Sequence, residues 1–364
     1  MSITLFNEDE NNASFRFQGH LSIANAIRRT VLNDIDTWVF ITSPNEENQA
    51  VFHTNTTRMN NELLKQRLSC IPIHVKYLNS KTDLTNYYLE VNVQNTEDTI
   101  LQVTTKDFIV KHKETNEVLE EEIFPPFISE EGERHYITFI VLRPQISAEI
   151  SGEKIHFTCA FSVGNARMNA MFNVVSNCSY GNTIDKDLCR QVLIKKKEEW
   201  EMTMSKEEVE KQVDNWWLLD AKRIFIPDSF DFTMETLGVF TNREIIIKAC
   251  LFILESLRKL SLSVESDDVN LDIKKSLTTI PNAWDIVFID DYTIGKMLEY
   301  SFTKTDVTYC GYIKLHPHDE QSTLRIAFKK EVMFDDLIEK IISAIEENID
   351  LFNNLGNGLI GQKK

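Results

Sequence analysis

The sequence has few glycines and little evidence of a catalytic motif. Only 11 of its 364 residues are glycine, which leaves little room for the glycine-rich loops that hold phosphate groups. The patterns G-x-x-x-x-G-K-[ST], H-E-x-x-H and G-x-S-x-G do not occur, so the usual signatures of a P-loop, a zinc protease and a serine hydrolase are missing. We therefore expect no phosphate-binding loop and no specific catalytic constellation.

Clustered cysteines are also lacking. No C-x-x-C pair occurs, which disfavours both a zinc site and a disulfide framework. We expect no metal and no cofactor, and a reducing, intracellular compartment. The six scattered cysteines are Cys70, Cys159, Cys178, Cys189, Cys250 and Cys310.

Long apolar runs and an excess of basic residues are missing as well. No apolar run approaches the roughly 18 residues that would span a bilayer, and no apolar signal segment follows Met1. Lys and Arg number 39 against 56 Asp and Glu, for a net charge of -17. This charge opposes binding to a phosphate backbone over most of the surface. We expect neither membrane association nor direct sequence-specific nucleic-acid binding.

One strand-turn-helix pattern occurs twice, near the two ends of the chain. The first copy, 15–29, alternates apolar and polar residues, turns at Gly19 and continues with helical spacing. The second copy, 287–298, has the same order. Ser22 and Thr293 occupy equivalent places, where a side-chain oxygen can cap a helix N-terminus. The repetition predicts two related modules in one polypeptide.

Between the first copy and the middle of the chain, the sequence changes to period-two alternation. A short helix is expected at about 60–69, and strands are expected around 89–93 and 155–163. We expect an α+β fold with an antiparallel β-rich domain, 48–164, inserted into a first dimerisation domain, 1–47 and 165–262. The remaining parts are a polar linker, 263–283, and a second dimerisation domain, 284–364.

The second half of the chain contains the most regular helical patterns. A charged helix is expected over 195–211, with Ser205 and Glu208 spaced as a capping box. A strand at 230–234 then leads to a helix opened by Thr241 and Glu244, and a last helix follows at 334–352. The last two helices carry long apolar stripes, which predict that they pack together as an intramolecular pseudo-dimer. The residues expected in that interface are Ile246, Cys250, Ile253, Leu254, Leu257, Leu337, Ile338, Ile341, Ile342 and Ile345.

A few polar residues could carry a function. His316 and His318 could ligate a metal, although incidental histidines in a loop are more common, and His20 could act as a general base, although such a residue is more often structural. The run 195–197 is more typical of a solvated helix face than of a nucleic-acid patch. Arg28 and Arg29 lie on an otherwise apolar helix, where guanidinium groups favour an interface.

Several separated segments resemble the assembly-platform subunits of multisubunit DNA-dependent RNA polymerases. This family includes the bacterial alpha subunit, the archaeal D and L subunits, and the eukaryotic third-largest and eleventh subunits. The similar segments are Leu21–Leu32, Asn55–Thr57 with Leu64–Ile73, Ala160–Ala170 through Tyr180, Phe230–Leu260, Asp291–Gly295 and Gly311–Pro317. Their order resembles a third-largest subunit fused to an eleventh-type subunit, an arrangement similar to that in large DNA viruses of eukaryotes.

The resemblance implies a non-catalytic polymerase subunit that acts as an assembly platform. Its expected partners are the largest and second-largest polymerase subunits, together with small polymerase subunits, and it implies contacts through Asn25, Arg28, Arg29 and Arg67. A viral protein of this kind would occur in the host cytoplasm and the virion, and otherwise in the nucleus. The cysteine-rich metal site of many third-largest subunits has no counterpart here, and Lys296 replaces the usual Asn of the eleventh-type helix.

Two alternatives remain open from the sequence. The same fold could serve as a stand-alone adaptor or regulatory binding module, which would associate with small partners instead of two large subunits. An enzyme is the less favoured alternative, with His316 and His318 as its only candidate site. Metal analysis of the purified protein distinguishes that alternative.

Overall fold

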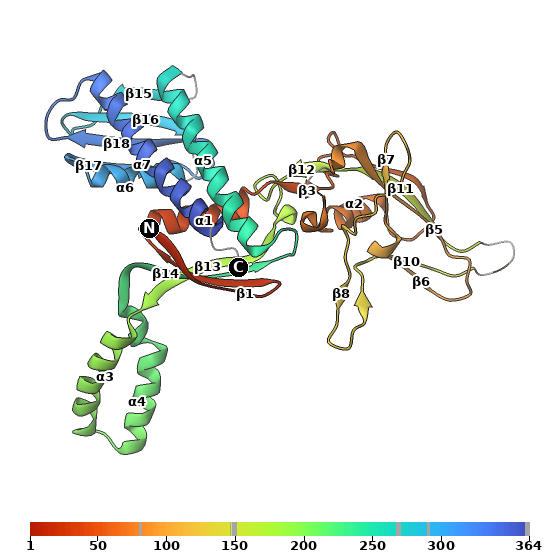
Figure 1. Cartoon of the computed structure of the whole chain (residues 1–364), viewed down its shortest axis with the longest axis horizontal. Helices are drawn as coiled ribbons and strands as arrows, with labels where there is room; N and C mark the ends of the chain where they lie inside the picture. Colours follow the sequence, from red (N-terminus) through yellow and green to blue (C-terminus); the bar gives the residue numbers. More distant parts are fainter. Residues whose placement is uncertain (80–81, 146, 148–150, 267–270, 290–291, 361–364) are drawn as a thin grey trace. The chain divides into compact units, whose positions relative to one another are not determined.

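The computed structural model describes residues 1–79, 82–145, 147, 151–266, 271–289 and 292–360 (Figure 1). The chain has a mixed α+β fold with antiparallel sheets. It divides into two compact units: unit 1 consists of 1–31, 177–235 and 242–364, and unit 2 of 32–176 and 236–241. The boundaries of unit 2 extend beyond the 48–164 expected for an inserted domain.

Unit 1 contains two four-stranded antiparallel sheets and six helices in its described part, with α1 ending just past its boundary. The first sheet has the order β1-β2-β14-β13 and the second has the order β15-β16-β18-β17. The strands are β1 (Ser2–Glu8), β2 (Asn12–Gln18), β13 (Val175–Ile184), β14 (Phe225–Thr236), β15 (Asp272–Lys275), β16 (Ala283–Ile289), β17 (Val307–Ile313) and β18 (Gln321–Phe328). The helices are α1 (Leu21–Asn33), α3 (Lys186–Glu201), α4 (Lys206–Leu218), α5 (Asn242–Ser266), α6 (Ile294–Thr303) and α7 (Phe334–Ile360), with a short 3-10 turn η5 (Asp220–Arg223).

Both copies of the strand-turn-helix pattern form the expected elements, β2 followed by α1 and β16 followed by α6. Thr293 is the N-cap of α6. The expected cap at Ser22 is wrong, because α1 already begins at Leu21 and the ring of His20 accepts a hydrogen bond from the Ser22 N–H at 3.2 Å. An imidazole therefore takes the capping role that the sequence assigned to a hydroxyl.

Helices α5 and α7 pack against each other in antiparallel directions (Figure 1). Their apolar stripes face inward, as expected from helical periodicity. Of the ten residues expected between them, Ile338 and Ile342 on α7 are half-buried and the other eight are buried. The burial of these two stripes removes a long apolar surface from water, which stabilises the helix pair.

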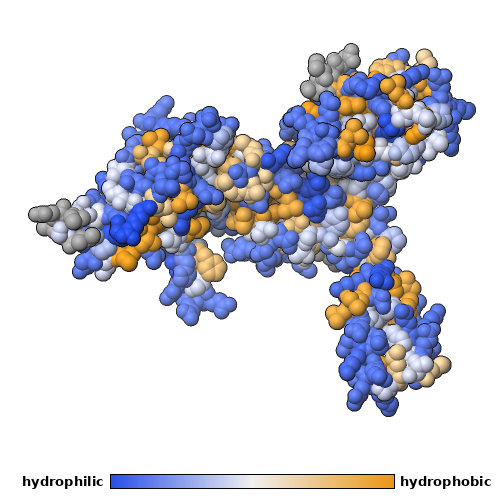
Figure 2. All heavy atoms as spheres, turned by 180° about the vertical axis from the view of Figure 1, so that it is seen from behind, coloured by the Kyte–Doolittle hydropathy of each residue, from blue (hydrophilic) through white to orange (hydrophobic). Residues whose placement is uncertain are grey.

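The charged segment expected as one helix is a hairpin of two helices, α3 and α4, which pack on each other (Figure 1). The chain turns between Glu201 and Lys206 because the Glu208 carboxylate accepts hydrogen bonds from the Ser205 N–H and hydroxyl, both at 2.9 Å. This capping box begins a second helix. Figure 2 shows hydrophobic surface where the hairpin joins its sheet, where Leu218 and Leu219 are exposed.

The segment 263–283 was expected to be a linker, but some of its described residues form regular structure. Helix α5 continues to Ser266, and β15 pairs with β16. Residues 267–270 lie outside the described residues. Strand β15 is polar because it is the edge strand of its sheet, where exposed lysines such as Lys274 and Lys275 are common.

Unit 2 is built around the four-stranded antiparallel sheet β4-β11-β5-β7. Period-two alternation forms this sheet as expected: Leu89 and Val91 of β5 and Ile155, Phe157 and Cys159 of β11 point into one core. The other pairs of strands are β10 with β6, β12 with β3, and β8 with β9. The elements are β3 (Thr37–Val39), β4 (Ala50–Asn55), α2 (Asn61–Ser69), η1 (Val75–Tyr77), η2 (Leu84–Asn86), β5 (Tyr87–Gln94), β6 (Leu101–Thr104), η3 (Thr105–Asp107), β7 (Ile109–His112), β8 (Phe127–Ile128), β9 (Arg134–His135), β10 (Thr138–Leu142), β11 (Lys154–Ala160), β12 (Ser162–Gly164) and η4 (Ala170–Phe172).

Candidate functional site

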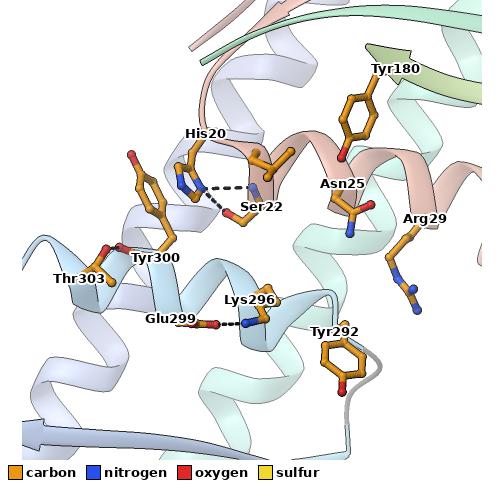
Figure 3. Close-up of a pocket in the computed structure, with 11 residues that line it drawn as sticks. His20, Ser22, Asn25, Arg29, Tyr180, Tyr292, Lys296, Glu299, Tyr300 and Thr303 are labelled. Carbon is orange, nitrogen blue, oxygen red and sulfur yellow. Dashed lines mark hydrogen bonds and ion pairs between the residues drawn. The ribbon is translucent and has the colours of Figure 1, made fainter. Parts of the chain in front are cut away.

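A groove lies between α1 and α6, the helices of the two repeated modules (Figure 3). Its cavity volume is about 670 Å³, and we refer to it as the α1/α6 groove. Because both helices belong to unit 1, the groove is formed within one compact body. Its lining residues are His20, Leu21, Ser22, Asn25, Arg29, Tyr180, Tyr292, Lys296, Glu299, Tyr300 and Thr303.

The N-terminus of α1 is joined to α6 through His20. The imidazole of His20 stacks on the Tyr300 ring, with centroids 3.4 Å apart and planes within 6° of parallel. Its Nδ1 atom also lies 2.9 Å from the Ser22 hydroxyl. Burial, opposed in part by Asp228, lowers the pKa of His20, which favours the neutral ring, whose Nδ1 can accept from the helix. These contacts favour the structural role of His20 over that of a general base.

Charged and amide groups on both helices give the groove a polar rim. On α6, Lys296 Nζ lies 2.5 Å from a Glu299 carboxylate oxygen. On α1, Arg28 donates from Nε and Nη2 to the Asn25 side-chain oxygen, at 3.1 and 2.9 Å. Arg29 lines the groove one residue further along. The Asn25 contact holds the Arg28 guanidinium in one orientation, so that little side-chain entropy would be lost if it bound a carboxylate or carbonyl.

Three of the residues that line the groove are tyrosines, Tyr180, Tyr292 and Tyr300. Tyr180 packs against Phe230 and Phe232 of β14, with ring centroids 5.3 and 5.1 Å apart. Burial raises the pKa of Tyr180, while the Arg28 charge acts in the opposite direction. Tyrosine and arginine around a polar groove are the composition of a protein-binding surface.

A small residue is needed where α6 leaves its sheet. A Cβ placed on Gly295 would lie about 2.0 Å from the Tyr312 ring. Tyr312 in turn meets the Tyr292 ring edge-on, with centroids 5.4 Å apart. The close approach at Gly295 therefore sets the position from which Lys296 and Tyr300 reach the groove.

The expected large-subunit contacts are divided between the two units. Asn25, Arg28 and Arg29 lie together on α1 in unit 1. Arg67 lies on α2 in unit 2, where one Nη atom donates to the Thr138 carbonyl at 2.9 Å. Tyr180, Glu299 and Tyr300 line the α1/α6 groove but were not predicted as site residues from the sequence. The repeated strand-turn-helix pattern was a signal for Glu299 and Tyr300, because it predicts that their helix, α6, corresponds to α1.

Candidate metal and phosphate sites receive little support from the structure. His316 and His318 lie in the segment between β17 and β18, both exposed, with ring centroids 5.0 Å apart. Within the described residues, no group of three or more His, Cys, Asp or Glu side chains could hold a metal ion. A G-x-G-x-x-G pattern does occur at 356–361, contrary to the expectation that the chain has no phosphate-binding loop motif. Its described part lies in α7 and not after a strand, so it lacks the context of a dinucleotide-binding loop.

In the described part of the chain, no helix is both long enough and apolar enough to cross a membrane. Comparison with known proteins gives no identification: no family model matches the sequence, and neither does any curated protein.

Proposed function

We propose that this chain is a non-catalytic subunit of a multisubunit DNA-dependent RNA polymerase and serves as the assembly platform for its two large catalytic subunits. The observation that best supports the proposal is the arrangement of the repeated modules in unit 1. Their helices α1 and α6 line one groove, while α5 and α7 bury their apolar stripes against each other. Two modules joined in this way form an intramolecular pseudo-dimer.

Fusion of the two modules gives the platform a fixed composition. Two separate subunits must find each other in solution, whereas two modules in one chain meet at an effective concentration on the order of millimolar. The platform then carries one copy of each module, and its two large partners meet different surfaces. The α1/α6 groove and the arginines of α1 supply one such surface, with aromatic anchors and a polar rim.

The experiment that tests the proposal is affinity purification of the tagged chain from its native setting, followed by mass spectrometry of stoichiometric partners. We expect two very large polymerase subunits. Recovery of small proteins only would contradict the platform role and favour an adaptor or regulatory module.

The same purification tests the α1 arginines. We expect Arg28→Ala with Arg29→Ala to leave the chain folded and to reduce recovery of the second-largest subunit by about tenfold or more, because guanidinium groups at an interface contribute strongly to binding. A matched control is Arg190→Ala with Arg223→Ala, since both of these arginines are exposed on or beside the hairpin. Undiminished recovery with the α1 variant would reject the assigned contact.

A further inference from the structure

Unit 2 contains a second groove, between α2 and β10, which we call the α2/β10 groove. It consists of two adjoining cavities of about 510 and 230 Å³, which share Met59, Arg67 and Thr138. The larger cavity is also lined by Leu63, Gln66, Cys70, Ile71, Ile137 and Phe139. The smaller is also lined by Thr57, Arg58, Ile140, Val141, Arg143 and Glu153.

The smaller cavity forms a basic end. Arg143 is matched by the buried carboxylate of Glu153, which accepts its Nε–H at 2.6 Å and its backbone N–H at 2.8 Å. Arg67 donates to a backbone carbonyl, which does not neutralise its charge. Arg58 is exposed, and in the described part of the chain it forms no ion pair, nor does Arg67. The Glu153 carboxylate also interacts electrostatically with Arg58. Three guanidinium groups against one carboxylate still leave an excess of positive charge here, on a chain whose net charge is -17.

The larger cavity forms an apolar end. Leu63 on α2 is 51% exposed and Ile137, just before β10, is 48% exposed. Beneath them, Ile71 and Phe139 are buried and give the cavity a fixed floor. Val141 extends the exposed apolar surface into the smaller cavity. Exposed large apolar side chains that cluster around a hollow are typical of an interaction site.

We propose that the α2/β10 groove binds a segment of a partner protein that carries one or two carboxylates next to a large apolar side chain. The apolar side chain enters the larger cavity, and the carboxylates pair with Arg58 and Arg67 in the smaller one. Arginine suits this role because its planar fork can hold a carboxylate through two parallel hydrogen bonds. The charge of the groove is complementary to such a segment.

A nucleic acid is a less suitable occupant. The exposed leucine and isoleucine side chains offer nothing to a phosphate, and the Glu153 carboxylate lines the basic end. The acidic remainder of the chain would also repel a long polyanion. The inference rests on the residues of unit 2 alone and does not depend on the polymerase proposal.

The test selects displayed random short peptides on the full-length chain and measures the affinity of the enriched peptides by fluorescence anisotropy. We expect enriched sequences to share an Asp or Glu within a few positions of Leu, Ile or Phe. Arg58→Glu should weaken their binding by about tenfold or more, because a charge-assisted contact becomes a repulsion. The matched control is Arg134→Glu, an exposed arginine on β9 of the same unit, which should leave binding unchanged.

A second pair of variants tests the apolar end. Leu63→Ser should also weaken binding, whereas Val51→Ser, at a residue of similar exposure on β4, should not. Thermal melting of each variant checks that it is folded, and Arg58 is suited to the test because its side chain is exposed. The proposal is overturned if no peptide is enriched, if enriched peptides lack acidic residues, or if Arg58→Glu and Leu63→Ser bind as the wild type does. Binding of a labelled oligonucleotide or of a second copy of the chain, abolished by Arg58→Glu in the absence of peptide binding, would also overturn it.

Discussion

Unit 1 contains two antiparallel helix pairs that differ greatly in how much they bury. Helix α5 alone buries nine residues, most of them aliphatic, whereas α3 buries only Cys189 and α4 buries Val209 and Trp216. Around Trp216 the hairpin has a small cluster of its own, with Cys189 and Ala221 at its centre. An antiparallel helix pair therefore forms a well-buried core at α5/α7 and a weakly stabilised hairpin at α3/α4.

The difference teaches that helix pairing alone does not indicate stability. Helix α5 pairs with a helix whose apolar stripe matches its own, so that hydrophobic burial stabilises both. In the hairpin, Ile194, Met202 and Leu218 are exposed, and the Lys196 ammonium covers the Trp216 ring at 4.6 Å. We expect the hairpin to open locally at much lower free energy than the α5/α7 pair.

The largest expected effect is at Ile253, which is fully buried on α5. Ile253→Asp should lower the free energy of unfolding by on the order of 5 kcal/mol, because it removes apolar packing and places a carboxylate in an apolar interface. Urea denaturation measures the change. Leu251→Asp, on the exposed face of the same helix, should have little effect. An unchanged free energy of unfolding in Ile253→Asp would contradict the interpretation that α5 and α7 form the core of unit 1.

An intermediate effect is expected at Trp216, the largest residue in the hairpin cluster. Trp216→Ala should lower the free energy of unfolding of the hairpin by about 3 kcal/mol, near the low end for truncation of a buried aromatic side chain. The rest of unit 1 should not be destabilised. The rates at which Cys189 and Cys250 react with a thiol reagent report the opening of the two helix pairs.

In this experiment Cys189 should react faster in Trp216→Ala, while Cys250 should not change. Burial raises the pKa of Cys250 to about 12, so its thiol stays protonated and inert until α5 separates from its partner. Trp217→Ala is the control, since that side chain is 38% exposed. Equal acceleration at both cysteines would mean that the hairpin and the core open together.

The smallest effect is expected at the turn of the hairpin. Ser205→Ala removes the hydroxyl of the capping box and should destabilise α4 by about 1 kcal/mol. Hydrogen exchange of the first amides of α4 measures this change. Met202→Ala, which alters an 83% exposed residue of the same turn, should leave exchange as it is. Faster exchange in the control alone would show that the turn is held by something other than its cap.

Periodicity predicted the elements whose structure is decided locally. The alternation in β5 and β11 and the stripes of α5 and α7 could be read from the sequence, because one buried face repeats at the period of the element. The turn in the charged segment was missed although its signal was present. Ser205 and Glu208 mark the start of a helix, and a helix start inside a helical pattern indicates a break.

Other features depend on contacts between residues far apart in sequence. Strand β15 was missed because an edge strand needs only one apolar face, and Ile273 is half-buried between polar neighbours. His20 is positioned as a cap by stacking on Tyr300, which lies near the other end of the chain. The α2/β10 groove likewise combines a helix with a strand that follows it much later, so no local pattern could reveal that Arg58, Arg67 and Arg143 share a cavity.

The order of elements along the chain has a consequence for synthesis on the ribosome. Unit 2 is complete once residue 241 has emerged, so it can fold early. Helix α5 ends at Ser266 and its partner α7 begins at Phe334. At translation rates of about 5–20 residues per second, the apolar stripe of α5 stays without its partner for several seconds before α7 has been synthesised. During that interval the nascent chain exposes the apolar stripe of α5 to the cell, and we expect chaperones to bind it there.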